Sequence, residues 1–132
     1  MDEAYRDAMR EHFAQLAEEL AEIEKLSAQE QRSAIVYRAT ERNLQLLIEA
    51  CIGVAKQTLK DRSTVVPGDA RKVFEKLKAL GLDSTNADWQ RVIGMRNALV
   101  HDYLNLDRER ILEVVRNGRY KVLFDFASER LT

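Results

Sequence analysis

The sequence has very few of the residues that break helices or cross-link chains. Its 132 residues include one proline, five glycines and one cysteine. The single cysteine, Cys51, cannot form an intrachain disulfide or a cysteine-based metal site, and its apolar neighbours predict a small core residue. Scarce proline and glycine, with abundant Ala, Leu, Glu, Arg and Lys, indicate an all-helical protein. We therefore expect a single domain over residues 1–132, long enough to bury a core.

The chain also lacks long apolar runs and a large net charge. Its most apolar stretch, Leu44 to Ala55, is interrupted by Gln45 and Glu49 and is too short to span a bilayer. No N-terminal run has the layout of a signal peptide, so a soluble, cytoplasmic protein is expected. The net charge of −1 argues against a protein that coats nucleic acid indiscriminately. Acidic residues concentrate in residues 1–30, however, so the remainder of the chain carries a modest positive charge.

Hydrophobic periodicity divides the chain into helices. The expected helices cover residues 2–26, 27 to about 61, 70–80, 87 to about 103, 107–115 and 119–130. The second is apolar around much of its circumference, which predicts a central helix contacted on several sides or one that also serves a dimer interface. Gly53 inside it suggests a close helix crossing. The result is an antiparallel bundle of four main helices with shorter terminal pieces.

Local signals mark the expected helix ends. Two capping boxes are predicted, Ser27 with Glu30 before the second helix and Thr85 with Asp88 before the fourth. Single aspartate caps and a left-handed glycine stop are expected for the shorter helices: Asp69, Asp107 and Gly81.

Arg96 interrupts the apolar face of the fourth expected helix. Projected at about 100° per residue, that face is an arc about 140° wide formed by Trp89, Val92, Ile93, Leu99, Val100, Tyr103 and Leu104. Arg96 falls in the middle of it. A guanidinium keeps its proton, so it needs there an anionic partner, a wet cleft or a neighbouring chain.

His101 lies about 140° around the same helix, beside Asn97. A lone histidine on a helix is commonly structural or exposed, but an imidazole exchanges protons near neutral pH. A guanidinium stabilises phosphate charge. The pair suits phosphodiester cleavage without metal or cofactor, His101 activating a ribose 2′-hydroxyl or protonating the leaving oxygen while Arg96 holds the phosphate. Five residues apart, the two side chains diverge, so a symmetric dimer that sets two copies across a cleft is expected.

The segment Arg96-x4-His101-x-Tyr103 resembles the R-x4-6-H signature of HEPN domains. It has the R-x4-H-x-Y form typical of HepT-like toxins paired with a minimal nucleotidyltransferase (MNT) antitoxin. The resemblance covers about residues 30–130, including the Leu-Ile-Glu-Ala-Cys-Ile run, the loop with Pro67 and residues 106–111. It implies an all-α, antiparallel four-helix HEPN-type bundle with a short additional C-terminal helix.

The same resemblance implies a function. It implies a homodimeric ribonuclease toxin with Arg96 and His101 as catalytic residues and Asn97 as an auxiliary one. Such toxins act on cellular RNA, with tRNA among the substrate classes, and the MNT partner neutralises them by adding AMP to the motif tyrosine, here Tyr103.

Two other hypotheses stay open at this point. The chain could be a non-catalytic, substrate-binding accessory subunit of an MNT enzyme, which the small net charge favours. It could also be a purely structural bundle, in which Tyr103 is a tyrosine at the core edge, but that reading leaves Arg96 unexplained. The intact Arg96, His101 and Tyr103 set favours the nuclease. Asp102 is expected to face solvent.

Overall fold

The computed structural model describes the backbone of residues 1–28 and 33–132, and the side chains of these residues apart from that of Tyr103. All regular elements in this part of the chain are helices, which confirms the predicted fold class. Its elements are α1 (Glu3–Ser27), α2 (Ala34–Asp61), α3 (Ala70–Ala79), α4 (Trp89–His101), the 3-10 helix η1 (Tyr103–Asn105), α5 (Arg108–Arg116) and α6 (Lys121–Leu131). None of these helices is long and apolar enough to cross a bilayer.

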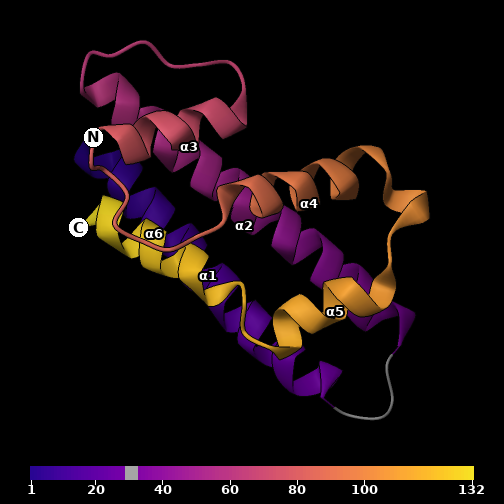
Figure 1. Cartoon of the computed structure of the whole chain (residues 1–132). Helices are drawn as coiled ribbons and strands as arrows, with labels where there is room; N and C mark the ends of the chain where they lie inside the picture. The colour runs from indigo at the N-terminus through magenta and orange to yellow at the C-terminus, as the bar shows by residue number, and fades with distance from the viewer. Residues whose placement is uncertain (29–32) are drawn as a thin grey trace.

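Helix α2 forms the centre of the bundle. It packs against each of the other five α-helices of the described chain. Figure 1 shows it crossing the molecule, with α1 and α6 along its lower side and α3 and α4 above. Its fully enclosed side chains include Leu47, Ile48, Cys51, Val54, Ala55 and Leu59. The predicted central helix with neighbours on several sides is therefore confirmed.

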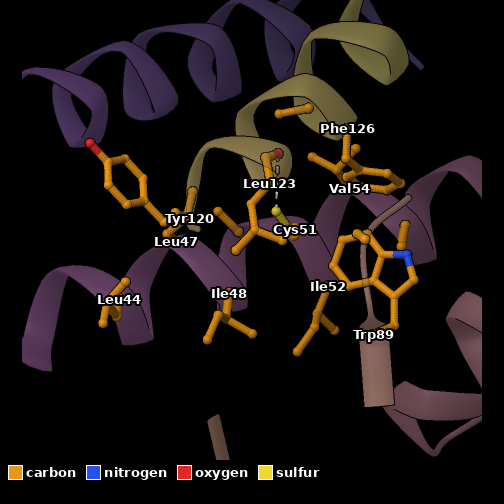
Figure 2. Packing of buried hydrophobic residues seen from close by; sticks show 14 of the residues in the cluster. Leu44, Leu47, Ile48, Cys51, Ile52, Val54, Trp89, Tyr120, Leu123 and Phe126 are labelled. Carbon is orange, nitrogen blue, oxygen red and sulfur yellow. Dashed lines mark hydrogen bonds between the residues drawn. The ribbon is translucent and has the colours of Figure 1, made fainter. Parts of the chain in front are cut away.

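Cys51 and Gly53 show how tightly α2 meets its neighbours. Figure 2 shows the Cys51 thiol pointing at α6, where it donates a 3.7 Å hydrogen bond to the carbonyl oxygen of Leu123. Burial raises the pKa of this thiol, so Cys51 is the inert core residue that was predicted. At Gly53, an added Cβ would lie 3.9 Å from the Tyr5 hydroxyl. That is an ordinary contact, so no close crossing requires the glycine.

The start of the second helix was predicted wrongly. Helix α2 begins at Ala34 with Ser33 as its N-cap. Ser27 is instead the buried last residue of α1, and its hydroxyl donates a 3.0 Å hydrogen bond to the carbonyl of Glu24. A hydroxyl already bonded within its own helix does not cap the next one. Glu30, the other half of the predicted capping box, lies outside the described residues.

The other predicted ends are mostly correct. Asp69 and Asp107 cap α3 and α5 by accepting hydrogen bonds from backbone N–H groups of the first turn. Gly81 has a φ of 71°, as expected for a left-handed stop. The box of Thr85 with Asp88 is wrong, because Asp88 itself caps α4.

The two ends of the chain lie at the same end of the bundle. In Figure 1 the labels N and C both stand at the left, whereas the turn that follows α4 lies at the far right. The residues singled out from the sequence gather near that turn.

Candidate functional site

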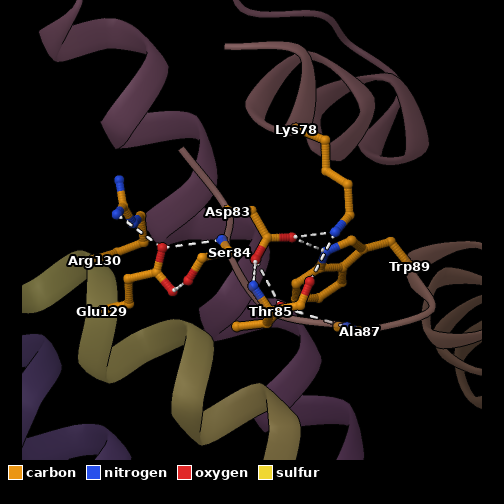
Figure 3. Close-up of polar contacts among 8 residues, drawn as sticks. All are labelled: Lys78, Asp83, Ser84, Thr85, Ala87, Trp89, Glu129 and Arg130. Carbon is orange, nitrogen blue, oxygen red and sulfur yellow. Dashed lines mark hydrogen bonds and ion pairs between the residues drawn. The ribbon is translucent and has the colours of Figure 1, made fainter. Parts of the chain in front are cut away.

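A buried carboxylate fixes where α4 begins. Figure 3 shows Asp83 receiving hydrogen bonds from the Trp89 indole Nε1 at 2.8 Å and from the Thr85 hydroxyl at 2.6 Å. Lys78 Nζ, from α3, lies 3.5 Å from the same carboxylate. The Trp89 ring also stacks on Phe74 with ring centroids 3.7 Å apart. These contacts hold the first residue of α4 against α3 and so set the rotation of the helix that carries Arg96.

The predicted motif spans two elements. Helix α4 ends at His101 rather than near residue 103, and Asp102 is its C-cap, donating its N–H to the carbonyl of Ala98. The exposed Asp102 carboxylate accepts a 2.7 Å hydrogen bond from Asn105 inside the following turn. Asp102 therefore faces solvent, as predicted. Tyr103 begins η1, so its place cannot be taken from the α4 helical projection, and its side chain lies outside the described part.

Of the three environments expected for Arg96, the structure shows an anionic partner. Its Nη1 lies 3.7 Å from Oε1 of Glu49 on α2. The Arg96 side chain is 22% exposed and that of Glu49 is 43% exposed, so the pair lies at the edge of the α2–α4 contact. The Arg96 Nε is buried and has no hydrogen-bond partner in the described chain.

Sequence reasoning did not assign Glu49 to the site. A signal for it existed, because Glu49 interrupts the apolar run of α2 just as Arg96 interrupts the apolar arc of α4. Opposite charges that each break an apolar face are candidates to pair where the two faces meet.

His101 and Asn97 are placed on the accessible side of α4. His101 is exposed, and no hydrogen bond or ion pair joins its imidazole to a described residue. Asn97 is half-buried, directly after Arg96. An imidazole without a partner keeps both ring nitrogens available for proton transfer.

The described contacts include none between Arg96 and His101. Val100, four residues after Arg96 on α4, is 36% exposed, and Leu104 in η1 is 83% exposed. Other members of the predicted arc, Trp89 and Leu99 among them, are buried. The arc is thus divided into a core-facing side and an uncovered side that borders the arginine.

A cavity of about 470 Å³ lies between α4 and α5. Its walls include Met95, Ala98 and Ile111 with Arg91 and Arg110, but neither Arg96 nor His101. The two motif residues therefore lie outside this cavity, on other faces of α4.

The chain is similar in sequence and in fold to known proteins. The chain is 30% identical over 77 residues to the mRNA nuclease HepT of Shewanella oneidensis strain MR-1. That match covers 57% of this chain and 58% of the relative's length.

The fold also has a solved counterpart. A chain in a crystal structure of a toxin-antitoxin with AMP-PNP superimposes with a TM-score of 0.81, covering 98% of this chain and 99% of that one at 19% identity. This likeness supports the HEPN-type bundle. The family model of HepT-like ribonucleases (Ribonuclease HepT-like) matches residues 9–130. The chain belongs to the HepT-like ribonuclease family.

Proposed function

We propose that this protein is the toxin of a HEPN/MNT toxin–antitoxin system, a metal-independent cytoplasmic endoribonuclease that acts on cellular RNA. The observation that carries the proposal is the end of α4. There a partly exposed arginine and an exposed histidine, which has no polar partner among the described residues, follow the R-x4-H pattern in a chain that belongs to the HepT-like ribonuclease family. The relative named an mRNA nuclease makes messenger RNA the first substrate to test and tRNA the second.

The chemistry needs a base, an acid and a group that neutralises phosphate. One His101 imidazole takes the proton of a ribose 2′-hydroxyl, and the 2′-oxygen attacks phosphorus while the bond to the 5′-oxygen breaks. A second imidazole, in its protonated form, gives its proton to that leaving oxygen. Arg96 stabilises the charge that grows on the phosphate oxygens, with Asn97 as an auxiliary donor. The products are a cyclic phosphate and a 5′-hydroxyl.

Two His101 imidazoles require two chains, because each chain supplies one. Because Arg96 and His101 diverge on one helix, we propose a homodimer in which the α4 helices of both chains line one cleft. Two exposed apolar residues near the end of α4 support this, because a second copy could cover them: Val100 on α4 and Leu104 in η1.

The antitoxin of this proposal is an MNT-type nucleotidyltransferase that adds AMP to Tyr103. A phosphodiester on Tyr103, which follows His101 by two residues, adds a negative charge and a bulky nucleoside beside the site. It would occupy Arg96 and obstruct an RNA phosphate, so one positive group serves both the reaction and its inhibition.

Expression without the antitoxin tests the nuclease. We expect growth arrest, relieved by His101→Ala and by Arg96→Ala in protein that stays folded. Unchanged toxicity in both soluble variants would exclude the nuclease. Cleavage of purified mRNA and tRNA in excess EDTA then tests metal independence and ranks the substrates.

The same purified protein separates the nuclease from the accessory-subunit alternative. A non-catalytic subunit leaves RNA intact yet changes the nucleotide transfer of an MNT enzyme. RNA cleavage that His101→Ala abolishes supports the toxin. A cleavage rate that both variants share with the wild type would point to a contaminant.

Coexpression with the MNT partner tests the modification. We expect intact-mass spectra with AMP additions that Tyr103→Phe removes. Neutralised toxicity with only unmodified protein would contradict modification and leave inhibition by binding.

A further inference from the structure

We propose that Glu49 is a positioning residue for Arg96, fixing the direction in which the guanidinium meets an RNA phosphate. This inference rests on the proposed ribonuclease function and adds a residue of α2 to a site otherwise formed by α4 and η1. The experiments below separate its failure from that of the proposed function.

The Arg96 side chain has one charged contact that orients it. Its Nη1 lies 3.7 Å from the Glu49 carboxylate, and no other hydrogen bond or ion pair joins the side chain to a described residue. Its Nε is buried without a partner. The base of the guanidinium is therefore enclosed by protein, while one edge is directed by Glu49.

An arginine can contact a carboxylate and a phosphate at the same time. A guanidinium presents five N–H donors in a rigid fork, so a carboxylate can hold one edge while other donors reach a phosphate. Without the carboxylate, the long side chain samples more rotamers, and fewer of them place its donors at the phosphate.

The same carboxylate opposes binding of the substrate. Glu49 is 43% exposed, so its charge is felt by an approaching polyanion. Removing the charge should favour RNA binding even as it disorders Arg96. A positioning role therefore predicts a fall in kcat with a KM that is unchanged or lower.

If the pair served mainly to stabilise the fold, Glu49→Gln would lower the unfolding midpoint. Ion pairs at this degree of exposure contribute little to folding, because solvent screens them and ordering two long side chains costs entropy. Glu49→Gln should consequently leave the unfolding midpoint close to that of the wild type.

The first test measures steady-state cleavage of an RNA oligonucleotide by Glu49→Gln, Glu49→Asp and a matched control. Glu113→Gln is the control, because Glu113 is 51% exposed and lies 4.0 Å from Nη2 of Arg119, in an ion pair that does not involve Arg96. We expect Glu49→Gln to lower kcat about tenfold without raising KM. Glu49→Asp should recover part of the loss, and Glu113→Gln should match the wild type.

Several outcomes would overturn the inference. A kcat for Glu49→Gln equal to or above that of the wild type would mean that Glu49 does not position Arg96. An equal loss in Glu113→Gln would show that any removed surface carboxylate has this effect. In both cases wild-type cleavage would still support the proposed function.

The second test does not depend on cleavage. The Nε–Hε resonance of Arg96, assigned with Arg96→Lys, reports the environment of the guanidinium in ¹⁵N-labelled protein. We expect Glu49→Gln to shift this resonance and to speed its exchange with water, whereas Glu113→Gln leaves it in place. An unmoved resonance in Glu49→Gln would refute the inference, whether or not the wild type cleaves RNA.

Discussion

The indole Nε1 of Trp89 donates a 2.8 Å hydrogen bond to Oδ2 of Asp83, a buried carboxylate six residues earlier. Through this bond the connection between α3 and α4 is tied to the first residue of α4 (Figure 3). The arginine and histidine of the site follow on that same helix. This hydrogen bond therefore helps to hold in place the helix that carries the candidate site.

Asp83→Ala should lower the free energy of unfolding by about 2–3 kcal/mol. The change removes a charged acceptor and leaves the buried Trp89 N–H without a partner. Urea denaturation followed by Trp fluorescence measures the loss. The control is Asp125→Ala, at an exposed position on α6, which should stay within about 0.5 kcal/mol of the wild type. Equal midpoints for Asp83→Ala and the wild type would contradict the proposed structural role.

Asp83 also predicts a loss of stability in acid. Burial by itself raises the pKa of this carboxyl, but hydrogen bonds from Thr85 and Trp89 outweigh it and leave the pKa below its ordinary value. When folding lowers the pKa of a carboxyl, that group stabilises the protein at pH values above its pKa in the unfolded chain, which is about 4. This contribution is lost as the pH falls through the pKa of the folded protein. The wild type should lose stability below about pH 4. Asp83→Asn should lose less over the same range, while Asp125→Asn should follow the wild type.

Tyr120 joins the start of α6 to the last turns of α1 and predicts the opposite pH dependence. Its hydroxyl donates a 2.8 Å hydrogen bond to Glu24, and burial together with Glu24 raises the pKa of Tyr120 to about 12. Its contribution is therefore complete below about pH 10, the unfolded value, and declines as pH rises toward 12. Tyr120→Phe should cost about 1 kcal/mol at pH 7 and weaken the alkaline decline. Chemical denaturation at pH 7 and pH 11 tests both effects.

Two glycine-to-alanine substitutions should change the stability in opposite directions. Gly53 lies inside α2, and an added Cβ would make only an ordinary 3.9 Å contact with the Tyr5 hydroxyl, so Gly53→Ala should raise stability by up to about 1 kcal/mol through helix propensity. Gly81 has a φ of 71°, which disfavours a Cβ, so Gly81→Ala should lower stability by about 1 kcal/mol. Thermal unfolding of the pair is the measurement. A loss on Gly53→Ala would mean that the helices pack more closely there.

Charges on the uncovered face should separate the proposed dimer. Val100→Lys with Leu104→Lys places two ammonium groups where a second copy would pack. We expect light scattering to give about twice the 15.2 kDa of one chain for the wild type and a single chain for the variant. Leu80→Lys, at an exposed leucine after α3, is the control and should remain dimeric. A monomeric wild type would refute the shared cleft.

The features predicted correctly depend on short stretches of chain. Asp69 and Asp107 were identifiable as caps because a cap involves only the residue and the next turn. Ser27 has the same local pattern but lies buried at the end of α1, and its burial is decided by helices distant in sequence. Local pattern and tertiary packing disagree there, and packing determines the result.

The predictions for the candidate site divide in the same way, between features of one helix and contacts between helices. The place of Arg96 on an apolar face predicted that it needs an anionic partner, a wet cleft or a neighbouring chain. The identity of the partner could not be predicted, because Glu49 reaches Arg96 only through the way α2 and α4 cross. The angle between His101 and Arg96 could be predicted, because it is a property of one helix, and the structure shows His101 exposed.

The shared position of the two chain ends, opposite the turn after α4 (Figure 1), has a practical consequence for experiments. A molecule immobilised through its C-terminus presents that turn to the solution rather than to the support. The proposed RNA substrate or antitoxin would then meet the Arg96 and His101 side of the molecule unhindered. Surface-based kinetics and optical tethering can use that geometry without altering any residue of the site.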